Sequence, residues 1–170
     1  MIKIGGRGSN PTVIDDLIQY DRLDIILTSD DKPVLVLEKT REVPTGHNVG
    51  QRVGRIVKAA EMGVPVIYFC PFDAKKHGDY ASVCNLNARM LKAFKNMSEI
   101  HQLPVLAMNW IVDDYYELIN DGRENEQISQ LINGYILSGF NIECEQIISL
   151  NNELESEYNT PGLERGLRIQ

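Results

Sequence analysis

The sequence lacks the features of membrane proteins, disulfide-rich secreted proteins and zinc-dependent proteins. No apolar run approaches the roughly 18–20 residues that a membrane helix needs, and the first residues contain no apolar signal-peptide segment. The chain has only three cysteines, Cys70, Cys84 and Cys144, which lie far apart and form no Cys-x-x-Cys pair. These absences predict a cytoplasmic protein with reduced cysteines and without structural zinc or a disulfide framework.

The sequence also lacks the residues that define a nucleotide-binding loop. Residues 2–11 are rich in glycine and precede an expected helix, but they contain no P-loop lysine in the required place. The strand before them is too short for a dinucleotide-binding fingerprint. A small-molecule enzyme built on this loop is therefore the weakest of three functional hypotheses.

Negative charge is in excess overall but is concentrated at one end of the chain. The 170 residues carry a formal net charge of −7. Residues 113–170 contain 12 Asp and Glu against 3 Lys and Arg, whereas residues 39–58 contain five basic residues and one acid. The basic segment can therefore face a polyanion although the whole protein is acidic.

The hydrophobic pattern predicts an α/β fold with a mixed central sheet flanked by helices. Helices are expected at 12–20, from about 48 to 62 and at 82–101, and strands at 23–27, 34–39, 64–69 and 104–108. The turn at 29–33 predicts an antiparallel hairpin, and the continuous apolar run at 64–69 is typical of a buried central strand. We expect an α/β core in residues 1–112. The helical, acidic extension in residues 113–170 should pack on that core instead of forming an independent domain.

Two carboxylates are expected to meet on the predicted hairpin. Asp24 lies inside the first strand, and Glu38 comes near the end of the apolar run Val34-Leu35-Val36-Leu37. Carboxylates that are brought together repel each other, so one stays protonated unless a cation joins them. Mg²⁺ is commonly held by one or two carboxylates and several waters, and it can stabilise the charge that develops on a phosphodiester. An acid on a solvent-facing strand position remains the simpler alternative for each residue alone.

The order of these segments resembles the core of the PD-(D/E)XK nuclease superfamily, which includes restriction endonucleases and many DNA-repair nucleases. The resemblance covers residues 22–70: LDIIL, a turn, VLVLEKT, a loop, an amphipathic helix and VIYF. It implies a restriction-endonuclease-like core in which Asp24 and Glu38 bind Mg²⁺ or Mn²⁺. It further implies DNA as the substrate and, by analogy, a homodimer.

The position two residues after the glutamate departs from the family pattern, because it holds Thr40 where the family has lysine. Strand side chains alternate, so Lys39 is expected to point to the opposite face from Glu38 unless the strand end bulges. A threonine can orient a water but supplies no cation. The residues expected to fill the lysine's place come from the following helix: Gln51, Arg52 and Arg55, and less favourably His47 and Lys58.

Two main hypotheses therefore follow from the sequence. In the first, the protein is a metal-dependent endonuclease. The predicted catalytic residues are Asp24, Glu38, Thr40, Lys39 and Gln51, and the predicted phosphate contacts are Arg52, Arg55, Lys58 and His47. In the second, the same core is a non-catalytic binding or assembly module that has lost the lysine.

Overall fold

The computed structural model describes residues 8–43, 47–75 and 83–158, and for residues 47–51 and 158 it describes the backbone alone. Its elements, in chain order, are α1 (Thr12–Leu17), β1 (Ile25–Ser29), β2 (Lys32–Lys39), α2 (His47–Glu61), β3 (Val66–Cys70), β4 (Asp73–Lys75), β5 (Val83–Asn85), α3 (Ala88–His101), β6 (Val105–Asn109), α4 (Arg123–Leu137) and α5 (Glu145–Tyr158).

The main sheet has the strand order β1-β2-β3-β6 and is mixed, as the sequence predicted. β1 runs antiparallel to β2, whereas β2, β3 and β6 are parallel neighbours. The hairpin reverses at Asp30 and Asp31, whose φ angles of +48° and +60° fit the tight turns that join twisted antiparallel strands. The expected α/β class and the mixed sheet are therefore confirmed, although β4 and β5 stand between β3 and α3, where no strand was expected.

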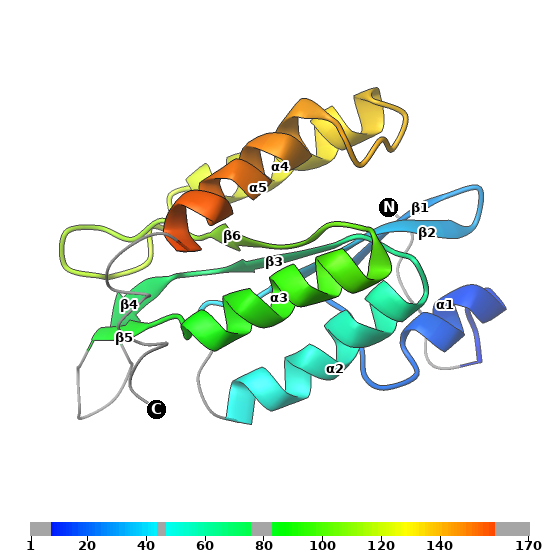
Figure 1. The fold of residues 1–170 in the computed structure, drawn as a ribbon, viewed down its shortest axis with the longest axis horizontal. Coiled ribbons are helices and arrows are strands. Elements are labelled where there is room, and N and C mark those ends of the chain that lie inside the picture. Colours follow the sequence, from blue (N-terminus) through cyan, green and yellow to red (C-terminus); the bar gives the residue numbers. More distant parts are fainter. Residues whose placement is uncertain (1–7, 44–46, 76–82, 159–170) are drawn as a thin grey trace.

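The helices cover both faces of this sheet (Figure 1). α1, α2 and α3 lie on one face, and α4 and α5 lie together on the other. The position of α2 is fixed by its apolar stripe, because Ile56, Ala59 and Ala60 are buried against the sheet. Gly63, with φ +74°, then turns the chain toward β3.

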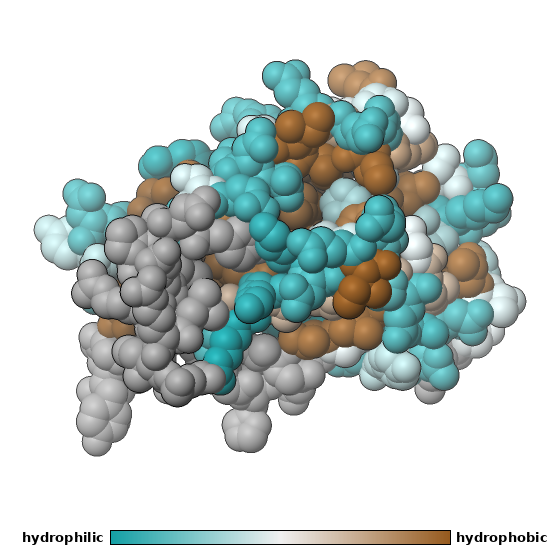
Figure 2. Space-filling model, viewed as in Figure 1, coloured by the Kyte–Doolittle hydropathy of each residue, from teal (hydrophilic) through white to brown (hydrophobic). Residues whose placement is uncertain are grey.

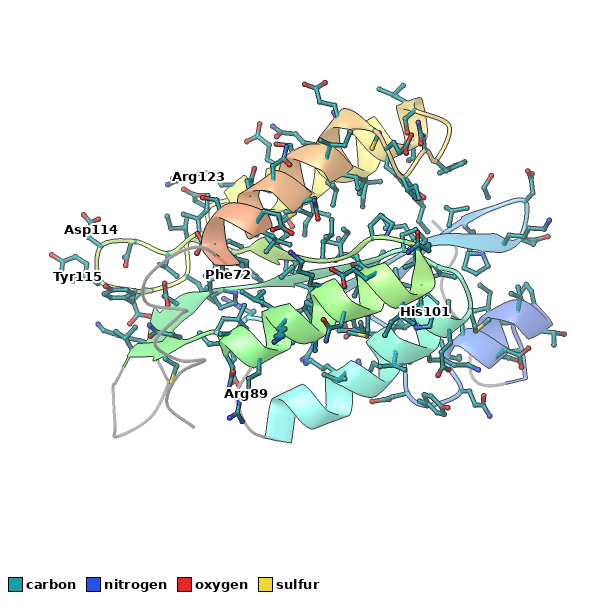
Figure 3. The ribbon with its side chains drawn as sticks, in the orientation of Figure 1. Phe72, Arg89, His101, Asp114, Tyr115 and Arg123 are labelled. Carbon is teal, nitrogen blue, oxygen red and sulfur yellow. The ribbon has the colours of Figure 1, made fainter. Side chains whose placement is uncertain are left out.

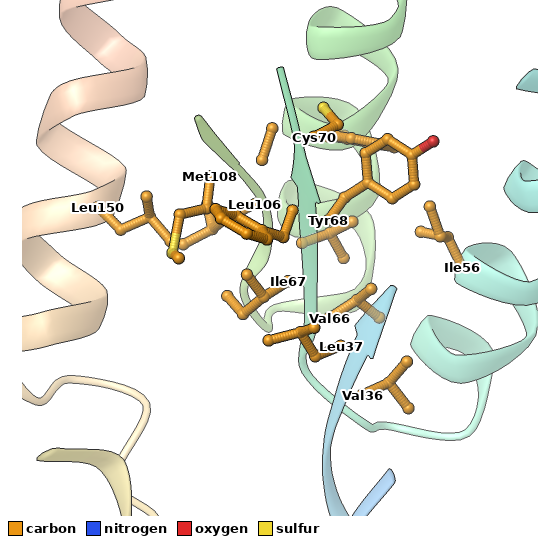
Figure 4. Packing of buried hydrophobic residues seen from close by; sticks show 14 of the residues in the cluster. Val36, Leu37, Ile56, Val66, Ile67, Tyr68, Cys70, Leu106, Met108 and Leu150 are labelled. Carbon is orange, nitrogen blue, oxygen red and sulfur yellow. The ribbon is translucent and has the colours of Figure 1, made fainter. Parts of the chain in front are cut away.

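Strand alternation divides the core between the two faces (Figure 4). Leu37, Ile67 and Leu106 lie on the side of α5, where Leu150 packs. Tyr68 lies on the opposite side, toward α2. Residues from α4 and α5 belong to the same buried cluster as those of the N-terminal half: Ile128, Leu131, Tyr135, Ile147, Leu150 and Leu154. The C-terminal helices therefore share one continuous core with residues 1–112.

Several boundaries differ from those expected, and three of the differences change how the site or the C-terminal third is described. β1 begins at Ile25, so Asp24 immediately precedes the strand instead of lying within it. α3 begins at Ala88 and not near residue 82, because Val83–Asn85 pairs with Asp73–Lys75 in a small antiparallel hairpin. In the C-terminal third, helix does not begin until Arg123, and Asp114 and Tyr115 project outward from the preceding loop (Figure 3).

Apolar patches appear on the face of the molecule shown in Figure 2. The large apolar side chains that are exposed in α3, α4, α5 and the loop before α5 are Ile100, Ile136, Leu137, Ile142 and Ile148. A nearby pocket is lined by residues of α3, α5 and the start of β6, including Leu103, Leu106 and Ile147, and by no predicted site residue. Among the described residues, no helix is long and apolar enough to cross a membrane.

We predict that residues 113–170 unfold together with the core. Tyr135 on α4 donates a hydrogen bond to the carbonyl oxygen of Val34 on β2, at 3.0 Å. Tyr135→Phe should lower the free energy of unfolding by about 1 kcal/mol, because that carbonyl loses its partner. Urea denaturation followed by fluorescence and circular dichroism should show one transition with an unchanged slope. Two separate transitions would contradict a shared folding unit.

Candidate functional site

Asp24 and Glu38 meet at the edge of the sheet where β2 ends. The register pairs Ile25 with Leu37, which places the preceding Asp24 opposite Glu38. The backbone N–H of Asp24 donates to Oε1 of Glu38 at 3.1 Å, and the N–H of Lys39 donates to Oδ2 of Asp24 at 2.8 Å. The carboxylate of each acid thus accepts a hydrogen bond from the backbone at or next to the other acid. The structure therefore brings the two predicted ligands together.

Two arginines from α2 cover this acid pair. Nη1 of Arg55 donates to Oε2 of Glu38 at 3.2 Å, and the same guanidinium binds the carboxylate of Asp21 through Nε at 3.0 Å and through Nη2. Nη1 of Arg52 lies 3.6 Å from both Oδ2 of Asp24 and Oε2 of Glu38. It donates a hydrogen bond to the carbonyl of Lys39 at 3.1 Å. α2 therefore supplies positive charge at the place where two carboxylates converge.

Glu38 is the most unusual ionisable group of the site. Its side chain is 0 % exposed, whereas that of Asp24 is 40 % exposed. Burial, and then the negative charge of Asp24, raise the pKa of Glu38 from 4.5 to about 7. Arg55 and Arg52 act in the opposite direction. Near neutral pH the Glu38 carboxyl is therefore poised between its two protonation states, and a further cation would favour the ionised form.

Lys39 takes the position that strand alternation predicts, and Thr40 follows the end of β2. Thr40 is buried, and its Oγ1 contacts the backbone of Glu42, accepting from N–H at 3.3 Å and donating to O at 3.4 Å. Lys39 lies on the other face, with Nζ 4.5 Å from the centre of the Trp110 ring. The structure therefore does not bring the Lys39 ammonium to the carboxylates, and Thr40 stabilises the loop after β2.

The remaining predicted residues fall outside this cluster or outside the described side chains. Nζ of Lys58 lies 5.7 Å from the centre of the Tyr20 ring, one turn of α2 beyond Arg55. The side chains of His47 and Gln51 lie outside the described residues, although both belong to the first turns of α2. Their proposed roles therefore stay predictions.

Two residues of the site were not found from the sequence. Asp21 binds Arg55 from the loop before β1, where no periodic pattern marks it. Tyr68 pairs with Glu38 in the parallel register of β2 and β3, and so shares its face of the sheet. The alternation of β3 would have indicated Tyr68 only if the register between the strands had been known.

The donor set fits a magnesium site of low ligand count. Among the described residues, no cluster of three or more His, Cys, Asp or Glu could hold a metal ion. Mg²⁺ does not require such a cluster, because it often retains several waters and binds only one or two carboxylates. Asp24 and Glu38 supply those two groups. Burial and the charge of Asp24 raise the pKa of Glu38 although two arginines lie beside it, so a further cation would favour its ionised form. The residues present therefore fit a hydrated divalent cation.

Comparisons with models of known protein families, with curated proteins and with solved structures give no match for this chain. The site's own geometry and the sequence resemblance are therefore the basis for inferring a function.

We predict a pH-dependent cost of burying Glu38. Because folding raises its pKa, the folded protein retains a proton that the unfolded chain releases between about pH 4.5 and 7. The cost is absent below that window and complete above it. Glu38→Gln should therefore gain stability relative to wild type as pH rises from 5 to 8, by at most about 3 kcal/mol. Urea denaturation of both proteins in metal-free buffer measures this difference, and a difference independent of pH would refute it.

Proposed function

We propose that this protein is a metal-dependent nuclease that hydrolyses DNA phosphodiester bonds on a restriction-endonuclease-like core. The observation that carries the proposal is a fully buried Glu38 carboxyl beside Asp24, at the end of β2 and below basic residues of α2. The mixed sheet, with β1–β2 as an antiparallel hairpin and β3 parallel to β2, supports it. The homodimer and the cytoplasmic location stay predictions.

Each residue has a distinct role in the proposed reaction. Asp24 and Glu38 hold Mg²⁺ or Mn²⁺, which would polarise a phosphate oxygen and lower the pKa of a bound water. Arg55 keeps Glu38 in place through its bonds to Glu38 and Asp21. Arg52, 27 % exposed, is the better placed of the two arginines to contact a phosphate. Gln51 or Thr40 would orient the attacking water, and for Thr40 this requires its hydroxyl to leave the backbone of Glu42.

Cleavage of DNA tests the proposal directly. Purified protein should cut long, unmethylated genomic DNA in the presence of Mg²⁺ or Mn²⁺ and leave it intact in EDTA; long DNA is needed because the recognition sequence is unknown. Glu38→Gln should reduce cleavage at least about 100-fold, because a neutral amide binds a hard cation far more weakly than a carboxylate does. Glu61→Gln, which removes an exposed acid at the far end of α2, is the matched control and should cut normally. Cleavage by Glu38→Gln at the wild-type rate would contradict the proposed nuclease site.

A second prediction follows from the position of Arg52. Its guanidinium stands within 3.6 Å of both carboxylates, so a bound divalent cation must share or take over that position. Arg52→Gln should therefore bind Mn²⁺ several-fold more tightly, because a competing positive charge is removed. It should also bind DNA more weakly in Ca²⁺, with the salt dependence reduced by about one counterion.

Lys58→Gln provides the comparison for this experiment. Lys58 lies on the same helix but over Tyr20, so its loss should weaken DNA binding without changing the affinity for Mn²⁺. Calorimetry gives the metal affinity, and fluorescence anisotropy at several salt concentrations gives the DNA affinity. Weaker Mn²⁺ binding by Arg52→Gln would contradict the proposed competition.

The non-catalytic module remains the alternative because the two arginines partly neutralise the acid pair without a metal. On this hypothesis, Arg52 and Arg55 are permanent partners of Asp24 and Glu38, and the fold serves to bind or assemble. Calorimetric titration of folded protein with Mn²⁺ separates the two functions: heat of binding that disappears in Glu38→Gln supports the nuclease, and a null titration supports the module.

A further inference from the structure

Tyr68 holds a buried hydroxyl that the fold itself does not use. Its side chain is 1 % exposed, and its Oη has no hydrogen-bond partner among the described residues. Buried side-chain hydroxyls in proteins are nearly always paired, so an unpaired one needs an explanation. The other fully buried tyrosine of the core follows this rule, because Tyr135 donates to the carbonyl of Val34 at 3.0 Å. The two tyrosines are thus both buried, but only the hydroxyl of Tyr135 has a hydrogen-bond partner. Packing alone does not explain why the other hydroxyl, that of Tyr68, is present.

The sheet directs this hydroxyl to the side of the acid pair. Glu38 and Tyr68 are directly paired in parallel strands, so their side chains leave the same face. Figure 4 shows the Tyr68 ring extending from β3 away from α5 and toward α2, the helix that carries Arg52 and Arg55. The ring packs edge-on against Phe94 of α3, with centroids 5.7 Å apart, which holds its direction.

The electrostatics agree with this placement. Burial is the main cause that raises the pKa of the Tyr68 phenol, followed by Cys70; Glu38 and Asp24 raise it further, and Arg52 lowers it. The phenol therefore stays neutral and keeps its proton at ordinary pH. A neutral hydroxyl can donate one hydrogen bond and accept another, which is suited to binding an ordered water.

We propose that Tyr68 is a positioning residue of the candidate metal site, and that its hydroxyl hydrogen-bonds an oxygen of the hydrated divalent cation held by Asp24 and Glu38. This inference rests on the proposed function. Mg²⁺ retains several waters when only two carboxylates bind it, and those waters need partners of their own. Groups that hydrogen-bond the ligands around a metal orient them, and their loss commonly weakens metal binding by ten-fold or more. Tyr68 lies on the same face of the sheet as Glu38, and its hydroxyl has no hydrogen-bond partner among the described residues.

The test compares Tyr68→Phe with Tyr135→Phe, which remove the same atom from the two buried tyrosines. Each protein is titrated with Mn²⁺ by calorimetry at pH 8, and its melting temperature is measured without metal. Tyr68→Phe should melt no lower than wild type, because it removes a hydroxyl without a protein partner, and it should bind Mn²⁺ about ten-fold more weakly. Tyr135→Phe should show the reverse: a lower melting temperature and an unchanged Mn²⁺ affinity.

Each other outcome has a defined meaning. If wild type binds Mn²⁺ and Tyr68→Phe binds it equally tightly, the inference is overturned while the proposed nuclease stands. If Tyr68→Phe melts lower than wild type to the same extent as Tyr135→Phe, or fails to fold, the hydroxyl has a structural role and the inference is also overturned. If wild-type protein binds no Mn²⁺, both the inference and the proposed function fall. If Tyr68→Phe loses affinity for Mn²⁺ while Tyr135→Phe keeps it, the result supports both the inference and the proposed function.

Discussion

The buried carboxyl of Glu38 is the constraint on which the site depends. A charge without solvent is costly unless other charges and hydrogen bonds replace the water, and a buried ion pair seldom repays the whole cost. Here the replacements come from three places: the N–H of Asp24, the guanidinium of Arg55 and, more distantly, that of Arg52. These bonds join the β1–β2 hairpin to α2. An apolar residue at position 38 would meet the packing requirement with less penalty, so packing alone does not account for an acid here.

Under the proposed function, the carboxylates of Asp24 and Glu38 would be neutralised by two kinds of cation, the arginines of α2 and a divalent metal. Arg52 approaches both carboxylates at 3.6 Å without a direct hydrogen bond to either, and it donates to the Lys39 carbonyl. Arg55 is held more firmly, since it donates to Glu38 and to Asp21 at once. The two arginines are therefore not equivalent. Arg55 belongs to the framework of the site, whereas Arg52 has weaker contacts and greater exposure. This suits the proposed exchange, in which a metal would take the place of Arg52 at the carboxylates and Arg52 would contact a phosphate.

Local patterns in the sequence predicted the features that depend on neighbouring residues. The alternation of β2 placed Glu38 and Thr40 on one face and Lys39 on the other, and the Lys39 ammonium does lie against Trp110. The apolar stripe of the second helix and the hairpin turn were predicted for the same reason. The error in α3 has a local cause too. Residues 83–85 continue the helical pattern, but pairing with Asp73–Lys75 outweighs it.

What the sequence could not supply was the relative position of distant segments. The Asp21–Arg55 bond joins residues 34 positions apart and leaves no periodic signal in either segment. Tyr68 becomes a site residue only through the register that pairs it with Glu38, and before that register is known it resembles any other aromatic residue of a buried strand. The side chains that determine how a cation would be held are thus those that depend on strand pairing.

The basic side chains beside the acid pair are arginines, whereas the Lys39 ammonium lies over Trp110, and this limits the chemistry that the proposed site could perform. A guanidinium remains protonated at any physiological pH, so Arg52 and Arg55 can stabilise negative charge but cannot accept a proton from water. Thr40 cannot accept it either near neutral pH. For the proposed hydrolysis, the proton of the attacking water must therefore pass to solvent, to a phosphate oxygen of the substrate, or to Glu38, whose pKa of about 7 lies in the working range of a general base. Binding a cation would lower that pKa, so a Glu38 that holds the metal is a poorer base. The arrangement thus fits a division of labour in which Asp24 and Glu38 would hold a cation that lowers the pKa of the attacking water, and the arginines would stabilise the negative charge that develops on the phosphate.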